Sequence, residues 1–276
     1  MADNDVAYWD DAYTNGAYIP GGDAFPAKWA ANAEAFRNEM SRKGRAELDQ
    51  SYGSHPRERF DLFMPEREPA GLFVFIHGGY WMRFDKSSWS HLAAGALARG
   101  WAVALPSYTL CPEVRIAGIT AQVGRAVTAV AARIGGELRL AGHSAGGHLV
   151  SRLNCADSPL PAAVRERLAH TVSISGLHDL RPFLKTTMNN TLRLDAPEAA
   201  HESPALLLPW PGARVTCWVG SAERPEFLRQ NALLANVWTG VGGRMAKHEA
   251  EGRHHFDVIE ELADPKSQLV SAVLDG

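Results

Sequence analysis

Short apolar runs alternate with longer stretches of helical spacing through most of the chain. The apolar runs predict strands that are buried on both faces; they are residues 59–64, 72–76, 102–105, 138–141, 171–174 and 215–219. Residues 87–99 and 114–134 lie between such runs, carry apolar residues at helical spacing and are each followed by glycine, as at a helix end. Strands that alternate with helices predict β-α-β units, and hence an α/β fold with a mostly parallel central sheet flanked by helices.

The chain before the first of these strands has a different character. Residues 1–50 are rich in aromatic residues and alanine and end in polar sequence of helical type. Within them, residues 25–40 predict a helix that Pro26 opens. Residues 177–212 carry several prolines and mixed polarity, which predicts an excursion over the carboxyl edge of the sheet, a small partial lid. We therefore expect a single domain over residues 1–276, in which the N-terminal segment covers the site.

Composition and charge narrow the class of protein. The 276 residues are 46% hydrophobic and carry a formal net charge of −3, which suits a globular domain and does not suggest a nucleic-acid or membrane-surface partner. The acidic N-terminus lacks the features of a signal peptide, and no apolar run reaches the ~20 residues of a membrane span. The cysteines Cys111, Cys155 and Cys217 are far apart, so we expect reduced thiols and a cytoplasmic protein.

A Gly-x-Ser-x-Gly pentapeptide at residues 142–146 is the most informative chemical signal. It follows the apolar run 138–141 and precedes an apolar helical stretch. A strand that turns sharply into a helix holds the central serine in a strained backbone conformation and exposes its hydroxyl. The flanking glycines suit this turn, because side chains there would clash as the chain reverses. Ser144 is therefore the candidate nucleophile.

A second motif, His-Gly-Gly-Tyr-Trp, occupies residues 77–81 directly after the apolar run 72–76. Attack by a serine on a carbonyl group places negative charge on the carbonyl oxygen, and backbone N–H groups aimed at that oxygen stabilise the charge. Glycines allow the close approach and the unusual dihedral angles that this requires. The candidate oxyanion-hole donors are the N–H groups of Gly79, Tyr80 and Ala145. The other reading of this motif is a plain turn.

Three histidines near the end of the chain, His248, His254 and His255, are candidates for the general base. Where a serine occupies such a turn, the chain order is serine, acid, histidine. His255 is preferred because residues 252–257 stand between a strand-like stretch and an apolar helical one, and His254 is the alternative. A metal site of His254, His255 and Asp257 is disfavoured, since adjacent residues rarely point both side chains at one ion.

The acid that would orient the imidazole is sought after the later strands. Glu223 stands in the loop directly after the run 215–219. Glu226, at a predicted helix start, could instead favour the helix dipole and be purely structural. Asp179 follows the preceding strand and is a second rival. We predict Glu223 as the acid and leave both rivals open.

Together these motifs resemble those of the α/β-hydrolase superfamily, and within it those of kynurenine formamidase (arylformamidase) and its bacterial relatives. The resemblance implies an α/β-hydrolase fold with Ser144 as nucleophile, His255 as base and Glu223 as acid. The family usually has aspartate where this chain has Glu223, so the geometry of the acid must shift. HGGxW also occurs in related esterases and carbamate hydrolases, and it therefore indicates the reaction type more firmly than the substrate. The matching segments are HGGYW at 77–81, GHSAGGH at 142–148, PEFLRQ at 225–230, HFD at 255–257 and, weakly, YTN at 13–15.

The expected reaction is acyl transfer through a covalent ester on Ser144, without a metal or organic cofactor. The resemblance implies a small-molecule substrate, an aryl formamide of the N-formylkynurenine type, and a place in tryptophan catabolism. Tyr80, Trp81 and the aromatic residues of 8–36 are expected to form an apolar wall for an aryl amine. An ordinary hydrophobic core is the other reading of these aromatic residues.

Two other functions stay open. One is a general carboxylesterase or thioesterase that acts on short acyl chains. The other is a catalytically inactive hydrolase fold that binds a ligand, and the intact Ser144, His255 and 77–79 motif argue against it. The oligomeric state also stays open, because Trp210 and Trp238 could belong to a homodimer interface as easily as to the core.

Overall fold

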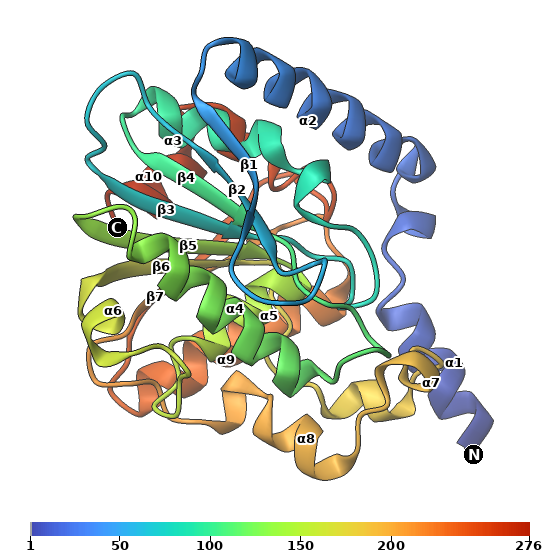
Figure 1. Cartoon of the computed structure of the whole chain (residues 1–276). Helices are drawn as coiled ribbons and strands as arrows, with labels where there is room; N and C mark the ends of the chain where they lie inside the picture. Colours follow the sequence, from blue (N-terminus) through green and yellow to red (C-terminus); the bar gives the residue numbers. More distant parts are fainter. Residues whose placement is uncertain (1) are drawn as a thin grey trace.

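A central sheet of eight strands organises the computed structural model, which describes residues 2–276 (Figure 1). The strands are β1 (Ala46–Ser51), β2 (Arg59–Phe63), β3 (Gly71–Ile76), β4 (Ala102–Pro106), β5 (Glu137–His143), β6 (Leu168–Ile174), β7 (Arg214–Gly220) and β8 (Arg244–Ala250). Their order across the sheet is β1-β2-β4-β3-β5-β6-β7-β8. β2 pairs antiparallel with β1 and β4, and the other neighbours pair in parallel. The predicted α/β architecture with a mostly parallel sheet is confirmed.

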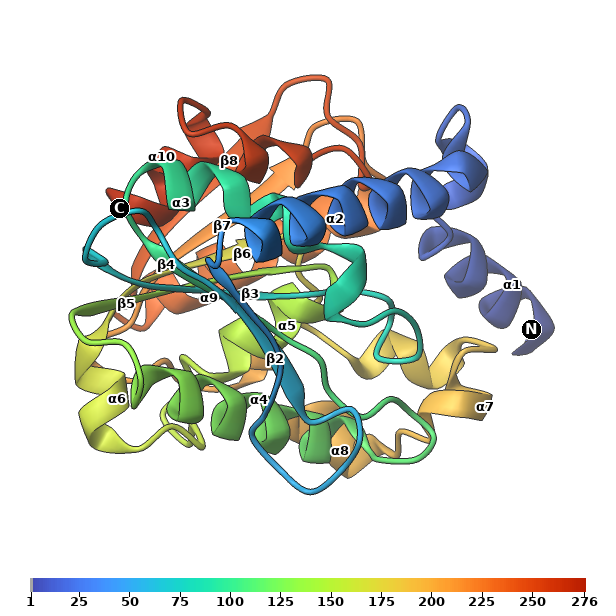
Figure 2. The ribbon, with the colours of Figure 1, turned by 45° about the horizontal axis from the view of Figure 1, so that its top comes forward.

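Helices cover both faces of the sheet. The α-helices are α1 (Ala2–Ala12), α2 (Phe25–Arg42), α3 (Ala94–Ala98), α4 (Ile116–Ala131), α5 (Ala145–Arg152), α6 (Ala162–Arg167), α7 (Asn189–Leu192), α8 (Ala196–His201), α9 (Pro225–Gly240) and α10 (Gln268–Leu274). The 3₁₀ helices are η1 (Gly16–Tyr18), η2 (Gly22–Ala24), η3 (Lys86–Ser88), η4 (Ser90–Ala93), η5 (Arg181–Lys185), η6 (Pro204–Leu206) and η7 (Glu260–Ala263). Figure 2 shows α2, α3 and α10 on one face, and α4, α5, α6 and α9 on the other.

The strand β3 shows why the central strands read as uninterrupted apolar runs. Successive side chains of a strand point to opposite faces of the sheet. Leu72 and Val74 therefore pack in the core that includes α4 and α5, whereas Phe73 and Phe75 pack in the core that includes α2, α3 and α10. Both faces are covered, so both sets of positions are apolar.

Three predicted elements differ from the structure. Residues 46–51, which read as polar helical sequence, form the edge strand β1, whose side chains are all at least partly exposed. The predicted helix 87–99 is broken into η3, η4 and the short α3, where a Cβ atom on Gly95 would lie 2.4 Å from the carbonyl oxygen of Leu262. The apolar stretch from Phe256 forms turns and η7 rather than a regular α-helix.

The N-terminal segment and the excursion of residues 177–212 meet beyond the carboxyl edge of the sheet, where α1 lies beside α7 (Figure 1). Nζ of Lys185 contacts the Asp5 carboxylate at 2.8 Å, and the Thr187 N–H donates to the Asp10 carboxylate at 2.8 Å. The two segments therefore form one rim around the edge where the loops of the parallel strands converge. Along residues 2–276, no helix combines the length and apolar character needed to cross a membrane.

Candidate active site

Ser144 stands at the turn between β5 and α5, with φ 57° and ψ −116°. A residue other than glycine rarely takes a positive φ, and such strain clusters at functional sites. The turn is tight, since a Cβ atom on Gly142 would lie 2.2 Å from the carbonyl oxygen of Gly146, and one on Gly146 would lie 2.0 Å from that of Ile76. Only glycine fits at both positions, which explains the spacing of the pentapeptide.

Glu223 and His255 follow β7 and β8, and their side chains meet. Nδ1 of His255 donates to Oε2 of Glu223 at 2.6 Å, with the His255 side chain 4% exposed and the Glu223 side chain fully buried. The second carboxylate oxygen, Oε1, accepts from the Ser175 hydroxyl at 2.5 Å and from the Gly220 N–H at 2.8 Å. A carboxylate can only accept, so Nδ1 carries the proton and Nε2 is left as the proton acceptor of the ring.

The rival acids and the rival base are engaged elsewhere. The Asp179 carboxylate accepts two hydrogen bonds from the guanidinium of Arg181, each at 2.9 Å. Glu226 accepts from the Tyr13 hydroxyl at 2.8 Å at the start of α9. Nδ1 of His254 accepts backbone N–H groups of its own turn. Of the predicted acids and bases, the structure therefore brings Glu223 and His255 together, whereas the ring of the third candidate base, His248, stacks on Trp218 with centroids 3.7 Å apart.

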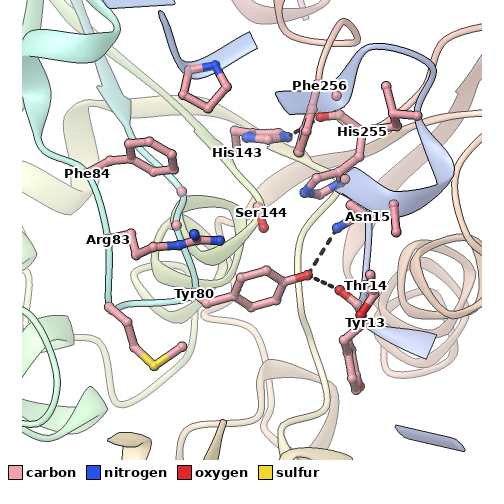
Figure 3. A pocket seen from close by; sticks show the side chains of 18 of the residues that line it. Tyr13, Thr14, Asn15, Tyr80, Arg83, Phe84, His143, Ser144, His255 and Phe256 are labelled. Carbon is pink, nitrogen blue, oxygen red and sulfur yellow. Dashed lines mark hydrogen bonds between the residues drawn. The ribbon is translucent and has the colours of Figure 1, made fainter. Parts of the chain in front are cut away.

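His143 contacts the backbone of His255 through a hydrogen bond. Burial, and then the neighbouring His255 ring, lower the pKa of His143 well below its usual range, so its imidazole is neutral. Its Nε2 lies 2.9 Å from the carbonyl oxygen of His255, and because a carbonyl only accepts, this nitrogen carries the proton. Ser144, His143 and His255 line the same cavity (Figure 3). The Ser144 hydroxyl has no hydrogen-bond partner among residues 2–276, and catalytic hydrogen bonds are often long before substrate binds.

The loop after β3 passes directly over the nucleophile. A Cβ atom on Gly78 would lie 3.0 Å from Cβ of Ser144. Burial lowers the pKa of His77 to about 4, and the neutral ring donates from Nδ1 to the carbonyl oxygen of Gly78 at 2.8 Å. In a planar trans peptide the C=O and N–H point in opposite directions. Because the Gly78 carbonyl is held toward His77, the N–H of Gly79 points the other way.

Backbone strain continues along this loop, where φ is 114° at Gly79, 53° at Tyr80 and 58° at Trp81. Within residues 2–276, the N–H groups of Gly79 and Tyr80 have no hydrogen-bond partner, and neither does that of Ala145 at the start of α5. Unpaired N–H groups beside a candidate nucleophile are the donors that an oxyanion hole needs.

The cavity above Ser144 has a volume of about 870 Å³. Its aromatic lining residues are Tyr13, Trp29, Tyr80, Phe84, Trp89 and Phe256. Trp81 does not line it, because this indole is fully buried and its Nε1–H is turned toward Nδ1 of His148 at 3.3 Å. This corrects the expectation that Trp81 contributes to a substrate wall, whereas Tyr80 stands in the wall as expected.

Tyr80 joins the loop after β3 to the N-terminal segment (Figure 3). Its hydroxyl donates to the carbonyl oxygen of Tyr13, and Nδ2 of Asn15 donates back to it at 3.0 Å. The Tyr13 hydroxyl in turn donates to Glu226. Residues 13–29 are thus held as one wall of the cavity.

The family relationship follows from comparison with known proteins. Residues 73–270 match the model of the alpha/beta hydrolase family. This chain belongs to the α/β-hydrolase family. It is accordingly a hydrolase, with the fold that the motifs predicted.

Relatives of this hydrolase include kynurenine formamidases. Those of Danio rerio and Drosophila melanogaster are 27% and 28% identical to it; the alignments cover 82% and 84% of this chain and 80% and 82% of theirs. A crystal structure of a proposed thioesterase from Silicibacter sp. TM1040 is 56% identical, with a TM-score of 0.91 over 96% of this chain and 98% of that one. An esterase from Pyrobaculum calidifontis, 17% identical with a TM-score of 0.65 over 91% of this chain and 90% of its own, shares the fold.

Sequence reasoning on this hydrolase did not single out two residues that the structure places at the site. Ser175, at φ 51°, holds Glu223, and nothing in the sequence marks a serine after β6 for a positive φ. Asn15 reaches Tyr80 from a segment 65 residues away, and only the weak YTN resemblance pointed to it.

Metal-ligating side chains are not clustered in the described part of this hydrolase: residues 2–276 hold no group of three or more His, Cys, Asp or Glu arranged around a common point. Cys111, Cys155 and Cys217 are buried free thiols. His254 and Asp257, considered above as metal ligands, form a local turn in which the His254 N–H donates to the Asp257 carboxylate at 2.7 Å.

Proposed function

We propose that this hydrolase uses Ser144, His255 and Glu223 as a catalytic triad and forms a covalent acyl-enzyme. The contact of 2.6 Å between His255 and Glu223, at one edge of the cavity that holds Ser144, carries the proposal. A carboxylate that fixes the ring with its proton on Nδ1 leaves Nε2 ready to take the serine proton.

In the first half of the reaction, Oγ of Ser144 attacks the substrate carbonyl carbon while Nε2 of His255 takes the hydroxyl proton. The carbonyl oxygen becomes an oxyanion, which the N–H groups of Gly79, Tyr80 and Ala145 stabilise. Removal of one such donor commonly costs about 2.7–4 kcal/mol of transition-state stabilisation. The bond to the leaving group then breaks, and His255 returns the proton to it.

In the second half, water attacks the ester on Ser144. His255 takes a proton from this water and returns it to Oγ as the acyl group leaves as a carboxylic acid. Glu223 stays ionised throughout and stabilises the imidazolium that forms in each half. Its two further hydrogen bonds, from Ser175 and Gly220, hold the carboxylate in place.

The substrate class that we propose is an aryl formamide of the N-formylkynurenine type. Two observations support this substrate class. Kynurenine formamidases match about four-fifths of this chain, and the cavity wall is rich in aromatic side chains. A formyl group needs little space on the acyl side, whereas an aryl amine needs the larger, apolar side. Trp29, Phe84 and Phe256 contribute apolar surface to this cavity, against which an aromatic ring can pack.

A second candidate function is hydrolysis of short acyl esters or thioesters. The observation that favours it is the 56% identity to a proposed thioesterase. The same triad serves both functions, because only the leaving group differs.

The deciding experiment compares kcat/KM for N-formylkynurenine, p-nitrophenyl acetate and p-nitrophenyl butyrate, with the Ser144→Ala variant as control. We expect N-formylkynurenine to be preferred by several orders of magnitude. If only the esters turn over, the triad stands and the substrate class is wrong. A serine-directed phosphonate should label the parent and not Ser144→Ala; full activity of that variant would overturn the mechanism, and absence of any turnover and labelling would favour a ligand-binding protein.

The cytoplasmic location, the absence of a nucleic-acid partner and a homodimer stay predictions. Trp238 is fully buried within one chain, with its Nε1–H donating to the carbonyl oxygens of Pro204 and Leu207. This indole belongs to the core, and we place no interface on it.

A further inference from the structure

Arg83 projects into the cavity from the strained loop after β3. Figure 3 shows its side chain between Phe84 and Tyr80, with the guanidinium turned to the side where Ser144 lies. Its backbone is fixed, since the Arg83 N–H donates to the carbonyl oxygen of Gly79 at 2.9 Å. The base of this side chain is therefore held at a defined distance from the nucleophile.

Arg83 is exposed, and its guanidinium takes part in no ion pair and donates no hydrogen bond among the described residues 2–276; it lies near the ring of Phe84, with Cζ 6.0 Å from the ring centroid. Two other arginines, Arg57 and Arg181, are engaged by protein groups. Arg57 donates to the carbonyl oxygen of Tyr108 at 2.8 Å, and Arg181 pairs with Asp179. Among the described residues that line the cavity, Arg83 is the only lysine or arginine.

A guanidinium carries a permanent charge and a planar fork of donors that matches a carboxylate. We propose that Arg83 binds a carboxylate of the substrate, so that this cavity selects aryl substrates that carry a negative charge. The inference rests on the proposed function for one point, the place of that carboxylate. The formyl group is a single carbon that bears only hydrogen. The carboxylate therefore belongs to the leaving group, the aryl amine.

Two carboxylates of the N-terminal segment also line the cavity and favour binding of a substrate anion at Arg83. Asp10 and Asp23 line the cavity from the N-terminal segment. The Asp10 carboxylate already accepts from the Thr187 N–H, and neither aspartate contacts Arg83 within ion-pair distance. Both would repel a carboxylate on their side and would tolerate a cationic group there. The arrangement thus sets the direction in which a charged substrate lies.

The test compares matched substrates in two series. One series is formanilide and its 2-, 3- and 4-carboxy derivatives, and the other is phenyl acetate and its three carboxy derivatives. For the parent enzyme we expect the best carboxy isomer to exceed the uncharged compound in kcat/KM by about ten- to hundredfold, the range of a hydrogen bond to a charged group. The gain should lie mostly in KM and should fall as ionic strength rises.

Variants of Arg83 then test whether this side chain causes the preference for carboxy substrates. Arg83→Gln should abolish the ratio of carboxy to uncharged substrate, and Arg83→Lys should keep part of it, because the charge stays and the fork is lost. Arg67→Gln removes the same charge from an exposed arginine outside this cavity and should keep the full ratio. Thermal melting checks that each variant is folded.

Two results would overturn the inference: no carboxy isomer is preferred in either series, or the preference survives Arg83→Gln. Failure of the proposed function looks different. If no formanilide is hydrolysed while the esters are, the formamide substrate is wrong, and the ester series still decides the role of Arg83.

Discussion

Oε2 of Glu223 lies 2.6 Å from Nδ1 of His255, and among residues 2–276 no other carboxylate contacts that ring. The Glu223→Gln variant presents an amide that can donate to Nδ1 and so favours the wrong tautomer. We expect kcat to fall by about 10³- to 10⁴-fold while KM changes little. Steady-state kinetics on the best substrate measures this.

The rival carboxylates provide matched controls for that variant. Asp179→Asn and Glu226→Gln remove a charge from the same edge of the sheet without touching His255. Each should keep kcat within about tenfold of the parent, as expected for sites outside the reacting group. Inactivation by Asp179→Asn together with an active Glu223→Gln would reassign the acid.

Ser175 is predicted to act through Glu223. Its hydroxyl donates to the carboxylate oxygen that does not face the histidine, so Ser175→Ala leaves Oε1 with one donor fewer. A hydrogen bond to a charged group contributes about 1.5–3 kcal/mol, and we expect kcat to fall by about ten- to hundredfold. Ser203→Ala, which removes a buried hydroxyl bonded to the Leu180 N–H, should reduce stability and leave kcat near the parent value. Equal losses of kcat in both variants would contradict a specific role.

The bond between Tyr80 and the N-terminal segment predicts a coupling between stability and substrate affinity. Tyr80→Phe leaves the Tyr13 carbonyl and Nδ2 of Asn15 without their partner, which costs about 1–3 kcal/mol of unfolding free energy. Because residues 13–29 lose this contact with the loop after β3, the cavity wall is held less firmly. KM for an aryl substrate should therefore rise more than kcat falls. Tyr18→Phe removes an exposed hydroxyl bonded to Asp11 and is the control. An unchanged KM in Tyr80→Phe would mean that the wall is held by other contacts.

Buried histidines predict acid sensitivity of the fold. Burial lowers the pKa of His77 and His178 to about 4 and that of His148 to about 3, against 6.5 for an ordinary histidine. Between about 4 and 6.5 the unfolded chain binds more protons than the folded one, so stability falls as pH falls through this window. Each such histidine contributes a slope of about 1.4 kcal/mol per pH unit.

Urea unfolding at a series of pH values measures this slope. We expect the unfolding free energy to be level above the ordinary histidine pKa and to decline steeply below it. His178→Gln should be less stable near neutrality, because bonds to Ser173 and Gln230 change, yet show a shallower decline toward acid. A parent protein whose stability does not depend on pH in this window would contradict the burial of neutral histidines.

The sequence predicted those parts of the fold and site whose signals are local. The apolar runs marked the strands from β2 to β7, and the glycines around Ser144 marked a turn that only glycine permits. β1 was missed because its edge position leaves every side chain partly exposed, so its polar residues imitate a surface helix. Residues 87–99 form η3, η4 and the short α3 instead of one helix, and the close approach of Gly95 in α3 to Leu262 is a contact that no local pattern encodes.

The remaining features of the site depend on contacts between distant segments. Glu223 was preferred over its rivals by its position after β7 and by the family resemblance, and the contact with His255 needs β7 and β8 to lie side by side. Ser175 and Arg83 were not singled out, and Asn15 was marked only by the weak YTN resemblance, because their surroundings come from three different loops. Trp81 was expected in the wall together with Tyr80, yet Tyr80 lines the cavity whereas the Trp81 indole is buried and turned toward His148.

The wall formed by residues 13–29 has a consequence for the order in which this site is made. During synthesis this segment leaves the ribosome long before Glu226 and Phe256, against which Tyr13 and Phe25 pack. It therefore has to wait for nearly the whole chain before it finds its partners. A ribosome-bound chain that ends before residue 226 lacks Glu226, β8 and Phe256, so residues 13–29 would have neither of these contacts until the last fifth of the chain is made.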